Sequence, residues 1–133
     1  MNKILLAYDG GEPAKRALEQ TIELAKRFGA SVGVVSVVPV HPGRVPVDPW
    51  DDRTVHAQEL LEARTLLREV GIEAELIEPG GDPAKVIERI ADERGYDTIV
   101  IGTRGLGTLT RMLQGSVSDH VATHAHATVI VAR

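Results

Sequence analysis

The sequence predicts an α/β fold: one five-stranded, mainly parallel sheet with helices on both faces. Two observations carry this prediction. Apolar runs of strand length alternate with helical patterns along the chain, in the order βαβαβαβαβ. The apolar runs are also continuous, as in strands that are buried on both faces. The length of 133 residues suits one domain, so we expect residues 1–133 to fold as a single unit.

Each element follows from a local pattern. Strands are expected where aliphatic residues run together, at Lys3 to Tyr8, Ser31 to Val38, Ile72 to Ile77, Thr98 to Ile101 and Thr128 to Ala132. Helices are expected where apolar residues recur every three or four positions, at Glu12 to Phe28, Asp51 to Val70, from Pro83 onward with Asp82 as its cap, and at Ser116 to His124. Four prolines between Pro39 and Pro49 predict a loop, and Gly80-Gly81 predicts the end of a strand.

Composition excludes several functions. Fifteen basic and nineteen acidic side chains give a net charge of -4, and aromatic residues make up 3% of the chain, which disfavours nucleic-acid binding. The chain contains no cysteine, so disulfides and thiolate chemistry are excluded, and a cytoplasmic location is expected. No apolar run is long enough for a membrane span or a signal peptide, so we expect a soluble, unprocessed protein.

The most informative motif follows the fourth predicted strand. Gly102-Thr103-Arg104-Gly105 is followed by nine residues and then by Gly115-Ser116, where a helix is expected to open. Glycines let main-chain N–H groups approach an anion, and a helix start adds unpaired donors, so a polyphosphate fits this loop. Ser116 is expected to cap the helix, to donate to a phosphate, or both. A purely conformational role of the glycines stays open.

Other phosphate-binding motifs do not match. The P-loop pattern is absent, and the glycines from Gly105 onward lack the third glycine of the dinucleotide fingerprint. A phosphoaspartate pocket would need an acidic pair after the first strand, where Asp9 stands alone before Gly10. The predicted ligand site therefore lies beyond the carboxyl ends of the strands, as is usual for such sheets.

With these motifs the chain resembles the universal stress protein family, in its nucleotide-binding branch. The segments that carry the resemblance are Ala7 to Pro13, Gly81 to Ala84, Ile99 to Gly105 and Gly115 to Ser118. The resemblance implies a Rossmann-like fold of the adenine nucleotide alpha-hydrolase type. Two positions depart from the family pattern: Gly11 stands where Ser is frequent, and Ala127 where Pro is frequent.

The resemblance also implies an adenine-nucleotide site. The glycines and the serine of the motif would contact phosphates and ribose, Asp9 would lie near the nucleoside, and the backbone of Val37 would meet adenine. The expected binding residues are Ala7, Asp9, Val37, Ile101, Gly102, Arg104, Gly105, Gly115, Ser116 and Val117. Arg104 is expected to pair with phosphate or to stay solvated, and Arg111 is the weaker candidate for such a pair.

The predicted function is that of an ATP-binding stress-response regulator. ATP, or ADP or AMP, would bind with Mg²⁺, with slow or no hydrolysis, because the motif offers no clear base for phosphoryl transfer; no catalytic residue is assigned. The alternative is a slow nucleotide hydrolase or phosphotransferase that uses Asp9 and Mg²⁺. A scaffold that has lost nucleotide binding is disfavoured by the intact glycines. A homodimer through the last strand, an exposed sheet edge, is expected, with an unknown protein partner.

Three histidines form a second candidate site. His120 and His124 are four residues apart on a predicted helix, and His126 follows. This spacing could present imidazoles to zinc, but the sequence offers no acidic ligand nearby. A solvated helix face is the favoured interpretation, and no metal site is assigned.

Overall fold

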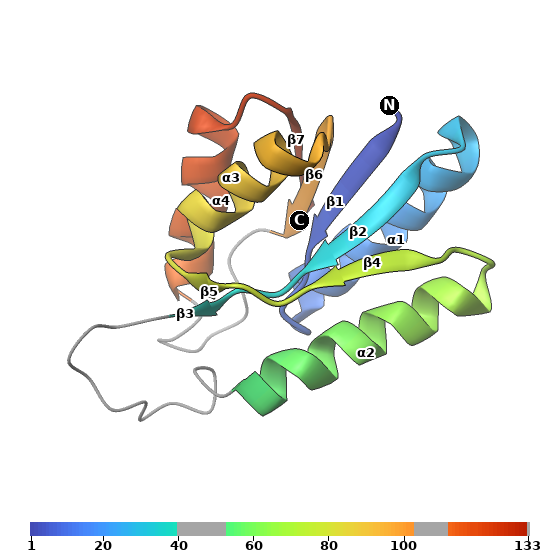
Figure 1. The fold of residues 1–133 in the computed structure, drawn as a ribbon, viewed down its shortest axis with the longest axis horizontal. Coiled ribbons are helices and arrows are strands. Elements are labelled where there is room, and N and C mark those ends of the chain that lie inside the picture. The colour runs from blue at the N-terminus through green and yellow to red at the C-terminus, as the bar shows by residue number, and fades with distance from the viewer. Residues whose placement is uncertain (40–52, 103–111, 133) are drawn as a thin grey trace.

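The computed structural model describes residues 1–39, 53–102 and 112–132, and these form a sheet between two layers of helices (Figure 1). The elements in chain order are β1 (Lys3–Ala7), α1 (Glu12–Phe28), β2 (Ser31–Val35), β3 (Val38–Pro39), α2 (Arg53–Glu69), β4 (Ala74–Ile77), β5 (Gly80–Gly81), α3 (Pro83–Arg94), β6 (Thr98–Gly102), α4 (Met112–His124) and β7 (Thr128–Ala132). The main sheet has the order β4-β2-β1-β6-β7. All of its neighbouring strands are parallel, which confirms the predicted fold class.

The two faces of the sheet are covered by different helices. α1 and α2 pack on one face, and α3 and α4 pack on the other (Figure 1). Side chains of a strand alternate between faces, and β1 shows the result: Ile4 and Leu6 join the first core, Leu5 joins the second, and all three are fully buried. Burial on both faces explains why the central strands read as continuous apolar runs.

Helix α1 has the predicted bounds. Pro13 stands in its first turn, where a missing N–H costs nothing. Ala14, Ala17 and Leu18 are buried against the sheet, as their spacing predicts. Gly29 ends the helix in the left-handed region at φ 64°, and its N–H donates to the carbonyl of Ala25.

The second predicted strand is divided, contrary to the prediction. β2 ends at Val35, and Val38–Pro39 form β3, which pairs with β5 in a separate two-stranded parallel sheet. The N–H of Val38 still donates to the carbonyl of Pro79, at 2.8 Å. Pro79 has no N–H with which to donate a hydrogen bond back. The hydrogen-bond ladder between the segments that continue β2 and β4 is therefore interrupted there. Pro39 is therefore part of a strand, and the rest of the predicted loop, residues 40–49, lies outside the described residues.

Other boundaries also differ from the predicted ones. β4 begins at Ala74 instead of Ile72, because the N–H of Ile72 donates to the carbonyl of Leu67 and closes the end of α2. Gly80–Gly81 form β5 instead of only ending a strand. Asp82 occupies the N-cap position of α3, but within the described part of the chain its carboxylate makes no capping hydrogen bond.

Helix α4 begins earlier than predicted. Its first residue is Met112, so Gly115 and Ser116 lie inside the helix and Ser116 is not its N-cap. The prediction treats the glycine as a helix boundary. Met112, Leu113 and Gln114 are residue types of high helix propensity, which explains the extra turn.

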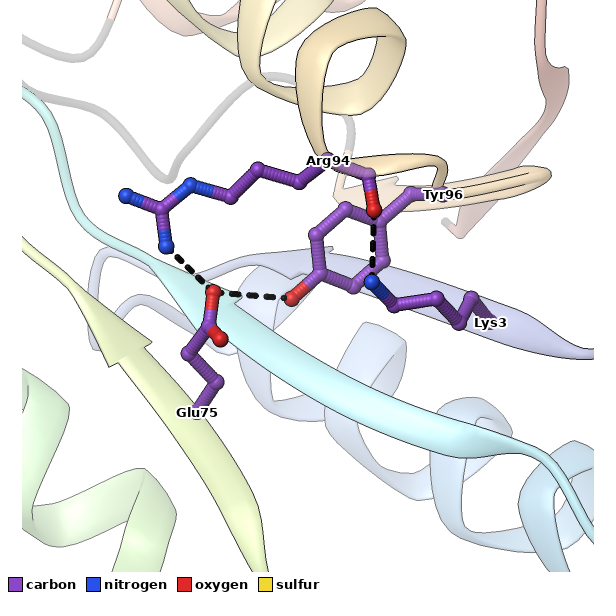
Figure 2. A network of polar contacts seen from close by, with 4 residues as sticks. All are labelled: Lys3, Glu75, Arg94 and Tyr96. Atoms are coloured by element: carbon purple, nitrogen blue, oxygen red, sulfur yellow. Dashed lines mark hydrogen bonds and ion pairs between the residues drawn. The ribbon is translucent and has the colours of Figure 1, made fainter.

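A polar network ties α3 to the amino ends of the strands (Figure 2). The ring of Tyr96 lies against β2, and its hydroxyl donates to Oε1 of Glu75 at 3.3 Å. Arg94 pairs with the same carboxylate oxygen. Lys3 Nζ lies 4.5 Å from the centre of the Tyr96 ring and donates to the carbonyl of Arg94. Burial, helped by the charge and hydrogen bond of Glu75 and opposed by Arg94, raises the pKa of Tyr96 to about 12.

Candidate functional site

The predicted site residues converge at the carboxyl edge of the sheet. Ala7, at the end of β1, lies in register with Val35 on β2 and with Ile101 on β6. Gly102 follows as the last residue of β6. Three adjacent strands thus end together, at the edge where parallel α/β sheets bind ligands.

The turn after β1 is built around Asp9. Its Oδ1 accepts a hydrogen bond from the N–H of Gly11 at 2.8 Å, which is an Asx-type turn. Gly10 between them has φ 79°, a conformation that side chains other than that of glycine rarely adopt. The half-buried carboxylate of Asp9 therefore serves the turn and lies at the candidate site at the same time.

The apolar residues of the predicted wall share one core. Val37 and Ile101 are buried in the apolar core that α3 also contributes to. Ala7 and Val117 are half-buried and pack against this core. Val117 reaches this cluster from α4, so the fold brings residues from four segments to one side of the sheet edge.

Several predicted residues cannot be placed at the site. Arg104, Gly105 and Arg111 lie outside the described residues. Gly115 and the backbone of Ser116 are within the first turns of α4, and the side chain of Ser116 is outside the described part. Their contact with phosphate stays a prediction.

Gly102 has a structural reason to be glycine. A Cβ at this position would lie 2.6 Å from the carbonyl carbon of Pro13 and 2.8 Å from its Cβ. These atoms belong to the first turn of α1 and cannot shift as a flexible side chain can. The missing side chain at Gly102 therefore lets β6 approach α1, whatever else binds there.

A buried polar cluster at this edge contains none of the predicted site residues. Ser36 Oγ lies 2.7 Å from Nδ1 of His56, and Oε1 of Glu59 lies 3.3 Å from the same nitrogen. All three residues are less than a tenth exposed. Two signals could have found the cluster: a serine at the end of an apolar run, and a histidine three residues before a glutamate in a helical pattern.

A second polar contact adjoins this cluster. The hydroxyl of Tyr8 donates to Oε1 of Glu62 on α2, at 2.5 Å. Burial raises the pKa of Tyr8 far above its usual value, and the hydrogen bond to Glu62 and the negative charges of Glu62, Glu59 and Asp9 raise it further. The Tyr8 hydroxyl therefore stays protonated, and this corner of the sheet edge carries negative charge.

Two of the three histidines on and just after α4, His120 and His126, contact α3. His120 Nδ1 lies 2.8 Å from Oε2 of Glu88, and His126 Nδ1 lies 3.1 Å from Oδ2 of Asp92. The rings of His120 and His124 stack with centres 4.1 Å apart. Within the described ranges, no group of three or more histidine, cysteine, aspartate or glutamate side chains is arranged to hold a metal ion. The expectation of a simply solvated face is thus wrong for His120.

β7 forms one edge of the main sheet, as predicted. Val131 on this strand is 37% exposed, and Val129 and Ile130 are half-buried.

None of the helices formed by the described residues is long and apolar enough to cross a bilayer.

Comparison with known proteins gives the family. The sequence model of the Universal stress protein family matches residues 1–133. Universal stress protein YxiE of Bacillus subtilis is 31% identical over 151 residues, with 99% of each chain covered. The universal stress protein of Archaeoglobus fulgidus in complex with dAMP is 29% identical, with 100% of this chain and 98% of that chain covered and a TM-score of 0.75.

A plant structure extends this similarity. The universal stress protein family member of Arabidopsis thaliana with AMP bound is 25% identical, with 99% of this chain and 91% of that chain covered and a TM-score of 0.68. Since the family match spans every residue and the sheet has the architecture that its members share, the chain belongs to the universal stress protein family.

Proposed function

We propose that this protein binds an adenine nucleotide at the carboxyl edge of its sheet and acts as an ATP-dependent stress-response regulator in the cytoplasm. One observation carries the proposal: Ala7, Asp9, Val37 and Ile101, four of the expected binding residues, lie at one edge of the fold. Two solved relatives of the same architecture hold dAMP and AMP. These ligands support binding of the adenosine part of a nucleotide, and the glycine motif that begins at Gly102 supports binding of a polyphosphate.

Mg²⁺ is expected to accompany ATP. The cation would neutralise phosphate charge, and the carboxylate of Asp9 at the sheet edge is a hard oxygen donor of the kind that Mg²⁺ prefers. The negative charge that Asp9, Glu59 and Glu62 place around Tyr8 favours a cation near the nucleotide.

Slow or absent hydrolysis is the expected behaviour. Fast phosphoryl transfer needs a group that positions or deprotonates the attacking water. Asp9 Oδ1 is engaged by the N–H of Gly11, and the imidazole of His56 is enclosed in the core. A slow hydrolase or phosphotransferase that uses Asp9 and Mg²⁺ is the second candidate, and the position of the Asp9 carboxylate is the observation that favours it.

Calorimetric titration tests the binding proposal. We expect ATP, ADP and AMP to bind the purified protein, and we expect Mg²⁺ to strengthen the binding of ATP more than that of AMP. No binding at millimolar nucleotide would contradict the proposal. A steady-state assay of phosphate release separates the two candidates: turnover above about 1 per second, in the range of ordinary enzymes, would favour the hydrolase. Loss of that turnover in Asp9→Asn would assign the reaction to Asp9.

A further inference from the structure

We propose that His56 is a positioning residue of the nucleotide site, through which helix α2 holds two segments of the site in a fixed relation. The inference rests on the proposed function and adds a residue that is not among the predicted site residues. The two segments are the stretch that directly follows β2, with Val37, and the turn after β1, with Asp9. Both lie at the carboxyl edge, and α2 packs beside them.

The first contact fixes the end of β2. Ser36 Oγ lies 2.7 Å from His56 Nδ1, and each residue is 2% exposed. Ser36 directly precedes Val37 and stands where the chain leaves the main sheet, since its own N–H still donates to Ile77. The hydrogen bond to His56 therefore acts at the point where the β2 ladder is interrupted, next to the residue whose backbone is expected to meet adenine.

The second contact places a carboxylate beside the turn after β1. Glu59 lies one helical turn from His56, and its Oε1 is 3.3 Å from the same imidazole nitrogen. The other oxygen, Oε2, lies 3.2 Å from the position that a Cβ on Gly10 would take. Gly10 follows Asp9. Ser36, His56 and Glu59 thus lie in contact with one another, and the Glu59 carboxylate lies beside the Asp9–Gly10 turn.

The geometry favours positioning over catalysis. Serine, histidine and glutamate are also the residue types of a hydrolytic triad, in which the serine and the carboxylate bind opposite nitrogens of the imidazole. Here Ser36 and Glu59 both face Nδ1, so a proton cannot pass from the serine through the ring to the carboxylate. The cluster is also buried, which keeps substrate away from Ser36 Oγ.

Removing the imidazole should loosen both segments. Ser36 would lose its side-chain partner in a buried position, where an unmet hydrogen bond is costly. The end of β2 and the turn after β1 would then no longer share a common support, and the nucleotide would have to order them on binding. Such ordering reduces affinity even where the variant never touches the ligand.

His56→Leu and His56→Asn form the test, with affinity for AMP measured by calorimetry. Leucine keeps the apolar volume and should weaken AMP binding about tenfold, the effect of about one hydrogen bond. Asparagine can place a donor near the position of Nδ1 and should restore most of the affinity. A purely structural role would change the melting temperature and leave AMP affinity unchanged. Asparagine would then have no loss of affinity to restore.

A matched control and a second variant complete the design. Thr21→Val removes a buried hydroxyl that donates to Ala17 on α1, away from the carboxyl edge, so it should lower stability without changing AMP affinity. If His56→Leu does not fold, Ser36→Ala is the milder variant, and it should weaken binding in the same direction. In a double-mutant cycle the two effects should be less than additive.

The outcomes separate this inference from the proposed function. Absence of ATP, ADP and AMP binding by the unmodified protein overturns both. Equal AMP affinity of the unmodified protein and folded His56→Leu or Ser36→Ala overturns only the positioning role. A folded His56→Asn that binds as weakly as His56→Leu also overturns it.

Discussion

The hydroxyl of Tyr96 occupies the space that a side chain on Gly33 would need. A Cβ on Gly33 would overlap this oxygen, well inside the sum of the two van der Waals radii, and would lie 2.6 Å from ring carbon Cζ. Gly33 pairs in register with Glu75, which accepts the hydrogen bond from Tyr96. The glycine in a buried strand thus makes room for a ring that crosses β2 to reach the edge strand β4.

Gly33→Ala should therefore destabilise the protein by about 1–3 kcal/mol, the usual cost of overpacking a close contact. Chemical denaturation measures the loss. Gly71→Ala is the control, because Gly71 also disfavours a side chain, at φ 80°, but a Cβ there would meet nothing within 4 Å. The cost of Gly33→Ala should shrink when Tyr96 is replaced by leucine. An equal cost in both backgrounds would contradict the assigned clash.

Gly102→Ala tests whether this glycine serves packing. The new methyl group would meet the backbone of Pro13, so we expect a loss of about 1–3 kcal/mol in the free energy of unfolding. The measurement is made without nucleotide, so that ligand binding cannot contribute. If stability is unchanged and only AMP affinity falls, Gly102 acts on the ligand and not on the contact between β6 and α1.

Gly115→Val should abolish or strongly weaken ATP binding while the fold survives. The side chain would project near the expected phosphate position at the first turns of α4. Ala122→Val is the control: it places the same β-branched residue at an exposed position of the same helix. Calorimetry with ATP compares the two folded variants. Unchanged ATP affinity in Gly115→Val would contradict the phosphate assignment.

Asp97 should make stability depend on pH. Burial, the largest single influence, raises its pKa, but hydrogen bonds from the N–H of Asn2, the hydroxyl of Thr98 and the N–H of Lys3, with the N-terminal charge, lower it overall. A carboxylate with a lowered pKa in the folded state contributes stability above its unfolded pKa of about 3.9. This contribution is lost as the pH falls through the folded pKa.

Asp97→Asn should therefore cost about 1 kcal/mol at pH 7, a small value because the group is mostly exposed. The difference from the unmodified protein should shrink below about pH 4. Glu19→Gln, which neutralises an exposed carboxylate on α1, is the control for charge alone. Melting temperatures over a pH series decide the matter, and a gap that stays constant down to acidic pH would contradict the prediction.

Val131→Lys should prevent self-association through β7. The edge of β7 has backbone groups that a second copy could pair with, and Val131 adds exposed apolar surface. Lysine on an edge strand opposes such pairing. Sedimentation should show a dimer for the unmodified protein and a monomer for the variant. Leu61→Lys, at an exposed apolar site on α2, should leave the dimer intact.

The sequence predicts what local patterns decide and misses what distant neighbours decide. β1, β7 and α1 follow from apolar runs and helical periodicity, and their predicted bounds agree with the structure to within one residue. β3 and β5 are two residues each, and only the tertiary pairing of Val38 with Gly80 makes them strands. No local propensity distinguishes such a segment from a loop.

The candidate site shows the same division. Asp9 can be found from the sequence because it ends a predicted strand at a turn. The pairing of Ser36 with His56 joins residues twenty positions apart, on opposite sides of residues 40–52, and depends on where α2 docks. The sequence leaves both a ligand role and a conformational role open for Gly102, and it does not reveal the contact with Pro13, because that contact arises only when β6 and α1 come together.

The two tyrosines of the chain lie at opposite edges of the sheet, Tyr8 beside the candidate site and Tyr96 in the network at the amino ends. Uniform labelling with fluorotyrosine would therefore yield two fluorine resonances. One variant that lacks one of the tyrosines would be enough to assign both. Nucleotide should shift the resonance of Tyr8, and that of Tyr96 would serve as an internal reference within the same molecule.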